Sequence, residues 1–164
     1  MTRLDPARVT LRPASVGDVE AIATIWHLGW RDGHLGHVPD QLHAHRRFMD
    51  FLQRVPGRLA TTTVAAIDGR VVGFVTVHGD EIEQMYVAES ARGSGVAAAL
   101  LQHGETAIAA RFDTAWLAVV EGNTRARRFY ARQGWRDTGP IDYSAETASG
   151  TFPVPSRRYE KRLR

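Results

Sequence analysis

Cysteine is absent from this 164-residue chain, and that absence excludes several kinds of chemistry. Disulfide bonds, thiolate nucleophiles and cysteine-ligated metal sites all need a thiol. Long apolar runs are missing as well, since no stretch approaches the roughly 20 residues of a membrane-spanning helix. The first residues, MTRLDPARVTLRP, lack the apolar segment of a signal peptide. We therefore expect a cytoplasmic protein that works without a membrane.

Lysine is almost as scarce, because Lys161 is the only one and the other basic side chains are arginines. The formal net charge is only +3. The arginines near the C-terminus are interrupted by Tyr159 and Glu160, which is typical of a solvated strand. Without a concentrated basic stripe or an aromatic stacking platform, we expect no nucleic-acid partner. His34 and His37 occur among glycines without a convincing third ligand, so we expect no metal.

The remaining composition fits one domain spanning residues 1–164, with 43% hydrophobic and 24% charged residues. Alternating or β-branched segments predict strands at 9–12, 61–67, 71–77, 81–87 and 114–120, with closing strands at 134–136 and 158–163. Helical spacing predicts helices at 19–30, 39–52, 96–111 and 123–133. The polar segment 141–155 is interpreted as a flexible loop near the pocket. Hairpins combined with one strand–helix–strand unit indicate a mixed α+β sheet.

A glycine-containing turn, Arg92-Gly93-Ser94-Gly95-Val96-Ala97, follows the strand 81–87 and opens the next helix. Glycine allows close backbone approach and tolerates positive φ. The free N–H groups of a helix's first turn, together with its dipole, favour an anion such as phosphate. Arg92 can add a charge-assisted contact. The turn is therefore a candidate phosphate-binding site, although a plain helix start without a ligand also fits these residues.

The same turn fits the fingerprint of a dinucleotide-binding fold, as Gly93-x-Gly95-x-x-Ala98. That fold needs an acidic residue about 20 positions further on, at the end of the next strand. Asp113 has the spacing but precedes the strand 114–120 instead of ending it. The first strands are also joined as hairpins. We therefore place the dinucleotide interpretation second.

Two motifs together resemble the GNAT N-acetyltransferase superfamily. The first, from Met85 to Ala97, matches the family's strand followed by Arg/Gln-x-x-Gly-x-Gly/Ala. The second runs from Asn123 through Phe129-Tyr130 to Gly134-Trp135. It resembles the family's Asn-x-x-Ala-x-x-Phe-Tyr-x-x-x-Gly-Phe signature, with Trp135 replacing the last Phe. The resemblance implies an acetyl-CoA-dependent N-acetyltransferase with a central, mostly antiparallel, splayed sheet flanked by helices.

The resemblance also implies how the acetyl-CoA co-substrate is held. The strand with Met85–Val87 is expected to carry a bulge and to splay from the strand with Leu117–Val120. The pantetheine arm would lie in that opening. The implied cofactor-binding residues are Met85, Tyr86, Val87, Arg92, Gly93, Ser94, Gly95, Val96, Ala97, Asn123 and Ala126.

Attack on a thioester requires an amine that has lost its proton and a leaving thiolate that gains one. Tyr130 is the candidate acid, because the resemblance places it beside the sulfur and its hydroxyl stays protonated at neutral pH. Adjacent helical residues diverge by about 100°, so we expect Phe129 and Tyr130 not to share one core. Glu81 and Glu83 are candidate bases; solvated hairpin charges and a base acting through water are the alternatives. A backbone N–H around Val87 is the expected oxyanion donor.

The acceptor is expected beside the first two helices, where Trp30 and His34 are candidate contacts of a polar amine. A helical core stripe is the alternative, and we favour it for Trp26. The predicted reaction acetylates a primary amine of a small molecule, amino acid or peptide in a ternary complex. The second functional class is a non-catalytic module that binds or senses acyl-CoA with the same fold. Monomer and homodimer both stay open.

Overall fold

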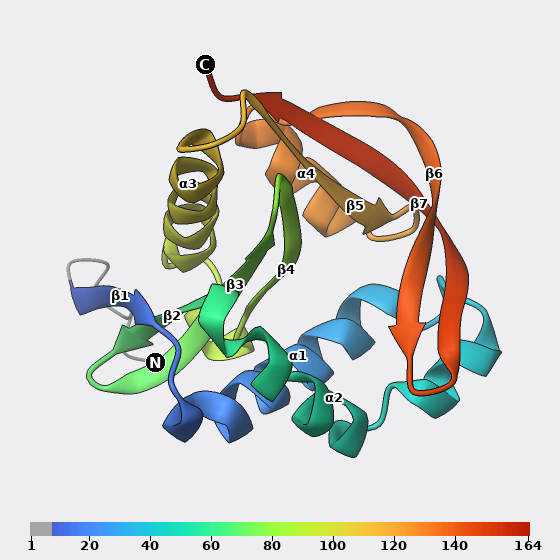
Figure 1. Cartoon of the computed structure of the whole chain (residues 1–164), viewed down its shortest axis with the longest axis horizontal. Helices are drawn as coiled ribbons and strands as arrows, with labels where there is room; N and C mark the ends of the chain where they lie inside the picture. Colours follow the sequence, from blue (N-terminus) through green and yellow to red (C-terminus); the bar gives the residue numbers. More distant parts are fainter. Residues whose placement is uncertain (1–7) are drawn as a thin grey trace.

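Within residues 8–164, which the computed structural model describes, seven β-strands form one sheet (Figure 1). The strand order is β1-β2-β3-β4-β5-β7-β6. The strands are β1 (Val9–Pro13), β2 (Thr62–Ile67), β3 (Arg70–His78), β4 (Glu81–Val87), β5 (Thr114–Val120), β6 (Arg136–Thr147) and β7 (Gly150–Arg162). The α-helices are α1 (Val19–His34), α2 (Phe48–Arg54), α3 (Val96–Ala109) and α4 (Thr124–Arg132). Residues 1–7, part of the segment expected to hold no signal peptide, lie outside the described residues.

Neighbouring strands run antiparallel everywhere except where β4 meets β5. These two strands run parallel and share one registered pair, Glu81 with Trp116. Beyond that pair they separate, so their facing edges do not form a regular ladder. The predicted mostly antiparallel, splayed sheet is confirmed. Asp113 directly precedes β5, as the argument against a dinucleotide-binding fold requires.

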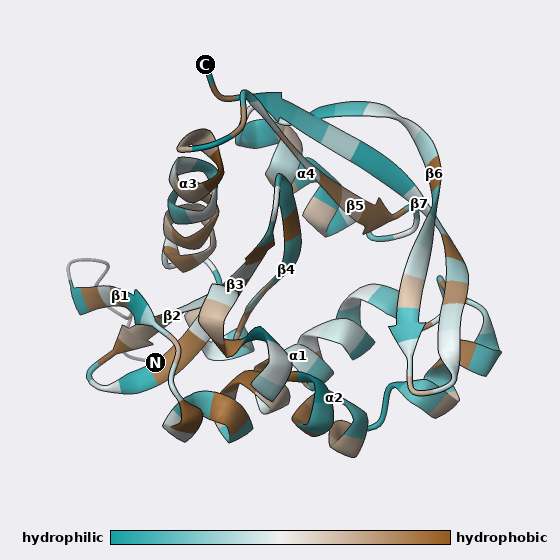
Figure 2. Cartoon of the chain, in the orientation of Figure 1, coloured by the Kyte–Doolittle hydropathy of each residue, from teal (hydrophilic) through white to brown (hydrophobic). Residues whose placement is uncertain are grey.

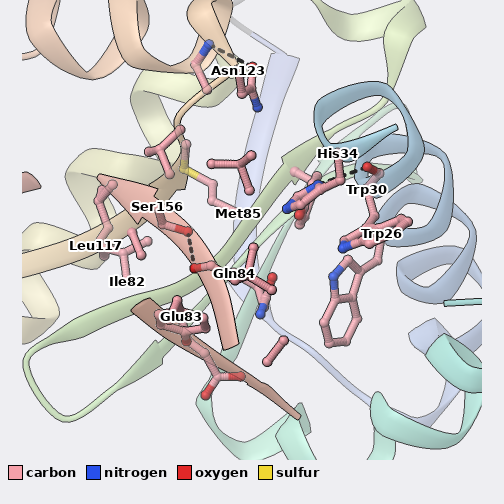
Figure 3. A pocket seen from close by; sticks show the side chains of 18 of the residues that line it. Trp26, Trp30, His34, Ile82, Glu83, Gln84, Met85, Leu117, Asn123 and Ser156 are labelled. Carbon is pink, nitrogen blue, oxygen red and sulfur yellow. Dashed lines mark hydrogen bonds between the residues drawn. The ribbon is translucent and has the colours of Figure 1, made fainter. Parts of the chain in front are cut away.

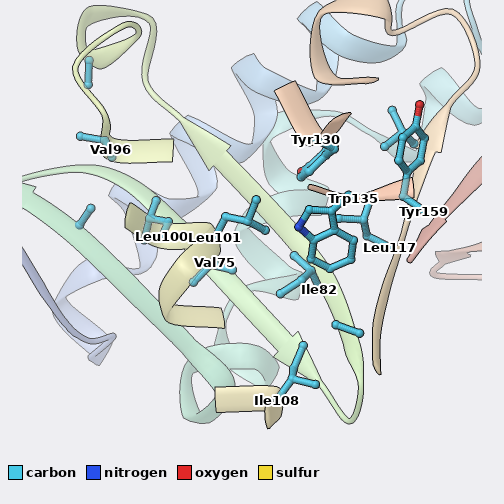
Figure 4. Packing of buried hydrophobic residues seen from close by; sticks show 14 of the residues in the cluster. Val75, Ile82, Val96, Leu100, Leu101, Ile108, Leu117, Tyr130, Trp135 and Tyr159 are labelled. Carbon is cyan, nitrogen blue, oxygen red and sulfur yellow. The ribbon is translucent and has the colours of Figure 1, made fainter. Parts of the chain in front are cut away.

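Helix α3 covers one face of the sheet, while α1 and α2 cover the other (Figure 1). The core on the α3 side includes Leu100, Leu101 and Ile108 (Figure 4). Gly104 allows α3 to approach β4 closely, because a Cβ at this position would lie 2.7 Å from Ile82 Cδ1. This contact fixes the first half of β4 against the helix.

The second core, on the α1 side, is rich in aromatic rings. Trp26 is 1% exposed, and its ring centroid lies 5.2 Å from that of Phe51 and 6.0 Å from that of Phe74. Fully burying one such side chain contributes about 1.5–3 kcal/mol. Gly29 of α1 faces Tyr86 of β4, since a Cβ there would lie 2.4 Å from Tyr86 Cδ1. The two cores therefore pack against both faces of β4. By contrast, hydrophilic residues, coloured teal, make up much of β7 (Figure 2).

The helix predicted at 39–52 is wrong as a single element. A 3₁₀ helix spans Asp40–His45, and α2 starts separately at Phe48. The backbone N–H of Arg47 donates to Asp50 Oδ2 at 2.7 Å. This bond satisfies a free donor at the start of α2 and favours a new helix there.

The flexible loop predicted at 141–155 is also wrong, because the segment forms most of a long β-hairpin. β6 and β7 pair from Arg136 with Glu160 to Thr147 with Gly150. β5 pairs with β7 only from Ser156 onward, so the tip of the hairpin is a two-stranded ribbon. Pro153 and Pro155 occupy alternate positions of β7 in that ribbon. Proline has no N–H to donate, which costs no hydrogen bond at positions that face the unpaired edge of the strand. The hairpin arches toward the helices on the α1 face (Figure 1).

Candidate functional site

A cavity of about 230 Å³ lies between α1, β4, β5 and the β6–β7 hairpin (Figure 3). Trp30 and His34 of α1 lie on one side of it, and Met85 and Leu117 lie on another. The predicted site residues that line this cavity are Trp30, His34, Glu81, Glu83, Met85, Tyr86, Asn123, Ala126 and Tyr130. The structure therefore brings the predicted base, acid and acceptor contacts to one place.

The predicted bulge in β4 determines which side chains reach the cavity. Thr76 of β3 pairs with Gln84, while Val77 pairs with Ile82, so Glu83 is the extra residue. The bulge breaks the alternation of side chains along the strand. Ile82 consequently packs in the α3-side core together with Met85, two positions that an unbroken strand would place on opposite faces. All six residues from Glu81 to Tyr86 line the cavity.

Glu81 is the first residue of β4 and is held by the hairpin. Its Oε1 accepts a hydrogen bond of 2.5 Å from the hydroxyl of Tyr143 in β6. The side chain is buried, at 9% exposure. Burial raises the pKa of Glu81 above its usual value, although the Tyr143 hydrogen bond opposes that rise. A carboxylate of this kind can take up a proton more readily than a solvated one.

Glu83 has a different environment, because Arg58 neutralises its charge. Arg58 Nε donates to Glu83 Oε1 at 2.6 Å, and Arg58 Nη2 donates to Glu146 Oε2 at 2.9 Å. Arg58 lies in a 3₁₀ helix, Pro56–Thr61, and Glu146 lies in β6. Glu83 is therefore one end of a bridge that connects β4 to the hairpin through a guanidinium.

Tyr130 lies in α4, and its side chain lines the cavity while its ring packs in the α3-side core (Figure 4). Burial raises the pKa of Tyr130, so the hydroxyl is protonated at neutral pH. Phe129 packs against the same core, and the two ring centroids are 5.2 Å apart. Our expectation that adjacent rings could not share one core is wrong. The two side chains diverge by about 100° around the helix, but each still lies within reach of the core beneath it.

Asn123 caps α4 and joins it to α1. Its Oδ1 accepts the backbone N–H of Ala126 at 3.2 Å, which satisfies a donor of the first helical turn. Gly33 makes room for the amide group, because a Cβ there would lie 2.7 Å from Asn123 Nδ2. Asn123 is thus fixed at the end of the cavity near Met85 (Figure 3).

The glycine turn lies outside the lining of this cavity, at the start of α3. Gly93 has φ +75° and Gly95 has φ +87°, and Gly95 is the residue that precedes α3. A Cβ at either position would meet no heavy atom within 4 Å, so the surface above them is open. The hydroxyl of Ser94 donates to the carbonyl of Ala91. Arg92 Nη2 donates to Asp32 Oδ2 of α1 at 2.8 Å.

The remaining turn residues differ in what they can offer. Val96 is fully buried in the α3-side core, and Ala97 is half-buried. The exposed positions of the turn are therefore Arg92, Gly93 and Gly95, with Ser94 half-buried. Val87 and Arg92 line a second hollow, between α1 and the end of β4. The turn, the end of β4 and the main cavity follow one another along the splayed edge of the sheet.

Trp30 and His34 form a stacked pair on α1. Their ring centroids are 4.8 Å apart with an interplanar angle of 7°. His34 Nδ1 lies 2.9 Å from the carbonyl oxygen of Trp30, so Nδ1 carries the proton of this bond. Burial lowers the pKa of His34 to about 4, and the imidazole is neutral at physiological pH. Trp26 belongs to the core, as favoured, but it also lines the cavity.

Several cavity residues were missed by sequence reasoning. Tyr143 and Glu146 fell in the segment interpreted as a loop. Arg54 and Arg58 are four residues apart, a helical spacing that places two guanidiniums on one side, but no partner was visible in the sequence. No motif or spacing in the sequence indicated that Arg46 belongs to the site. The missed lining residues with charged or phenolic side chains are Arg46, Arg54, Arg58, Tyr143 and Glu146.

Two structural features are absent from the described residues. Between residues 8 and 164, no group of three His, Asp or Glu side chains is placed to hold a metal ion. In the same range, no helix is both long and apolar enough to cross a lipid bilayer.

Known proteins share both the sequence motifs and the fold. Residues 20–135 match the acetyltransferase (GNAT) family. An uncharacterised N-acetyltransferase of Mycobacterium tuberculosis is 35% identical over 113 residues, which cover 65% of this chain and 70% of that protein. A GCN5-related N-acetyltransferase structure from Rhodopseudomonas palustris has a TM-score of 0.73 at 21% identity, covering 99% of this chain and 98% of the other. The PaiA N-acetyltransferase of Thermoplasma acidophilum, solved with coenzyme A, has a TM-score of 0.69 at 15% identity, covering 94% and 98%. The chain therefore belongs to the acetyltransferase (GNAT) family and is an N-acetyltransferase, as its two motifs predicted.

Proposed function

We propose that this chain, acting as one domain over residues 1–164, transfers an acetyl group from acetyl-CoA to a primary amine of a small molecule, amino acid or peptide. The observation that carries this proposal is the position of Glu81 and Tyr130. Both line one cavity at the edge where β4 separates from β5. A buried carboxylate and a protonated phenol at the open edge of the sheet supply the two proton transfers that the reaction needs.

The residues along the splayed edge fit an acetyl-CoA molecule. Gly93 and Gly95 form an open cradle where a Cβ would protrude without contacting the protein. The first turn of α3 offers N–H groups and the positive end of a dipole to a diphosphate. Arg92 would add a charge-assisted contact after exchanging Asp32 for phosphate. Backbone groups of Met85, Tyr86 and Val87, with Asn123 and Ala126, would hold the pantetheine arm.

Acetyl-CoA supplies an activated acyl group, because the C–S bond of the thioester breaks when an amine nitrogen attacks its carbonyl carbon. In our proposal Glu81 accepts the proton that the amine loses, directly or through water. Its pKa is raised by burial, which brings the carboxylate closer to the working pH of a general base. We prefer Glu81 to Glu83 for this role, because Arg58 already holds the Glu83 carboxylate at 2.6 Å.

Tyr130 donates its hydroxyl proton to the departing sulfur, and a backbone N–H around Val87 stabilises the oxyanion. The raised pKa of Tyr130 keeps its hydroxyl protonated at neutral pH, so the residue is present as a proton donor and not as a phenolate nucleophile. The chain has no cysteine to carry the acyl group, which favours direct attack in a ternary complex. Trp30 and neutral His34 would contact the acceptor.

The direct test is release of free thiol from acetyl-CoA in the presence of a panel of primary amines and peptides, with binding of acetyl-CoA followed by calorimetry. We expect binding without an acceptor and thiol release with at least one amine. Binding without thiol release from any acceptor would favour the non-catalytic acyl-CoA-binding module. Failure to bind acetyl-CoA at all would contradict both functions.

A further inference from the structure

Three arginines gather at the end of the cavity that the hairpin covers. Arg46, Arg54 and Arg58 all line it. Arg58 is paired with both Glu83 and Glu146. Among residues 8–164, no carboxylate lies within 4.0 Å of the guanidinium of Arg46 or Arg54. Glu81, Glu83 and Glu146 line the same cavity, but the two guanidiniums of Arg46 and Arg54 have no direct carboxylate partner.

The side chain of Arg46 is held by backbone carbonyls and not by a carboxylate. The residue is 6% exposed. Its Nη1 donates to the carbonyl oxygen of His45 at 3.0 Å, and its Nη2 donates to that of Glu146 at 2.7 Å. Carbonyl oxygens orient a guanidinium without cancelling its charge. A charged group held this way on a cavity wall is prepared for an anionic ligand.

Two buried donors beside Arg46 lack acceptors. Among the described residues, Trp26 Nε1 and Arg54 Nε are buried and have no hydrogen-bond partner. Trp26 is 1% exposed and lines the cavity. The Arg54 guanidinium lies 4.5 Å from the centroid of the Trp26 ring, and Arg54 lines the same cavity. Native proteins rarely bury N–H groups without acceptors, and such groups need an explanation.

We propose that Arg46, Arg54 and Trp26 bind an oxyanion of the acceptor, which is therefore a small amine that also carries a carboxylate or phosphonate group. This inference rests on the proposed acetyl transfer and names its substrate class. Arginine matches the geometry of such oxyanions with two donors at once. A neutral amine would leave the buried donors of Trp26 and Arg54 without partners, and the guanidiniums of Arg46 and Arg54 without a direct anionic contact.

The positions of the groups agree with a single small acceptor. Arg46, Arg54 and Trp26 line the same cavity as Glu81 and Tyr130, so an acceptor held there by its oxyanion shares one space with the proposed base and acid. Burial and the neighbouring guanidiniums lower the pKa of Arg54 to about 10, so the side chain stays charged at neutral pH. The cavity of about 230 Å³ is small compared with common ligand pockets of about 300–1,000 Å³, which favours a small molecule over a folded partner.

The experiment compares acceptors that differ only in the acidic group. Thiol release is measured with a panel of α-amino acids, their neutral carboxamides and their phosphonate analogues. The variants are Arg54→Met, Arg54→Lys and the control Arg158→Met. Arg158 is a suitable control because its guanidinium also lies over an indole, 4.4 Å from the Trp116 ring centroid, but outside the cavity lining.

We expect at least one acidic acceptor to exceed its carboxamide in kcat/KM. Arg54→Met should reduce kcat/KM for that acceptor about 10- to 100-fold, as expected for loss of a charge-assisted hydrogen bond. The carboxamide should change less than about 2-fold, which is the scatter expected of a surface substitution. Arg54→Lys should restore part of the loss, Arg158→Met should have little effect, and calorimetry should show unchanged acetyl-CoA affinity in every variant.

The outcomes separate this inference from the proposed function. If carboxamides react as well as acidic amines, and Arg54→Met affects both equally, the oxyanion site is wrong while acetyl transfer stands. If carboxylates and phosphonates differ, the preferred one identifies the geometry of the oxyanion and supports the site. If acetyl-CoA binds but no amine of any kind releases thiol, the proposed transfer fails, and the acceptor site fails with it.

Discussion

The hydroxyl of Tyr143 donates a 2.5 Å hydrogen bond to the carboxylate of Glu81, although 62 residues separate them in the chain. Tyr143 belongs to the hairpin, and Glu81, at the start of β4, is itself a member of the registered pair that joins β4 to β5. The hydrogen bond therefore connects the cover of the cavity to the proposed base. It also favours the ionised form of Glu81 and counteracts the effect of burial on its pKa.

Replacing Tyr143 with Phe should move the acid limb of the pH profile of kcat/KM to higher pH. Glu81 must be ionised to accept a proton, so activity falls as the pH drops below its pKa. The substitution removes a hydrogen bond to the carboxylate, and the pKa of Glu81 then rises further above its usual value. A hydrogen bond to a charged group contributes about 1.5–3 kcal/mol, which corresponds to a shift of about 1–2 pH units.

The control for this shift is Glu83→Gln, which leaves both Glu81 and Tyr143 in place. Its activity can fall because Arg58 loses a partner, and its acid limb should move to lower pH, opposite to the shift in Tyr143→Phe, because the charge of Glu83 contributes to the raised pKa of Glu81. Glu81→Gln should abolish the acid limb together with most of the activity. An unchanged acid limb in Tyr143→Phe would show that Glu81 is not the group that titrates.

Tyr130→Phe tests the proposed acid. The substitution keeps the ring that packs in the α3-side core and removes only the hydroxyl. Loss of a general acid typically lowers turnover about 10²- to 10⁴-fold, and we expect kcat for thiol release to fall in that range. Acetyl-CoA affinity, measured by calorimetry, should stay the same. Unchanged turnover would assign the proton transfer to another group or to water.

Much of this site was predictable because its backbone is encoded locally. The glycines at 93 and 95 predicted the turn, and both adopt positive φ. The tip of the hairpin was not predictable, since its polar residues and prolines resemble a loop until pairing with β7 is known. The arginine cluster was missed for a related reason. Arg46 and Arg54 become unusual only when the fold places them together without a carboxylate, and sequence spacing cannot show burial or charge balance.

Gly95→Ala tests the phosphate cradle, and Gly79→Ala provides a matched control. Gly95 has φ +87° and Gly79 has φ +60°, and a Cβ at either would contact nothing within 4 Å. Both substitutions should lower the free energy of unfolding by about 1–2 kcal/mol, the cost of a left-handed backbone for alanine. Only Gly95→Ala should also weaken acetyl-CoA binding, by about 10-fold if one charge-assisted hydrogen bond is lost. Equal affinities in the two variants would place the diphosphate elsewhere.

The last prediction concerns stability, and it rests on Asp18 just before α1. Arg12 of β1 binds its carboxylate through two hydrogen bonds, of 2.8 and 2.9 Å, and the backbone N–H of Ser15 donates to it at 2.8 Å. These donors lower the pKa of Asp18 from 3.8 to about 2. Because the folded pKa lies below the unfolded one, the stabilisation is complete above about pH 4 and is lost as the pH falls toward 2.

Asp18→Asn should therefore lower the free energy of unfolding by about 2 kcal/mol at pH 7. The difference from the unmodified protein should shrink as the pH falls from about 4 to about 2. Urea denaturation at several pH values measures both effects. Asp68→Asn is the control, because the Asp68–Arg8 pair is 3.4 Å long and its side chains are 56% and 63% exposed. An exposed pair contributes at most about 1 kcal/mol. Equal losses of unfolding free energy in the two variants would show that the hydrogen bonds of Asp18 stabilise the fold no more than an exposed ion pair does.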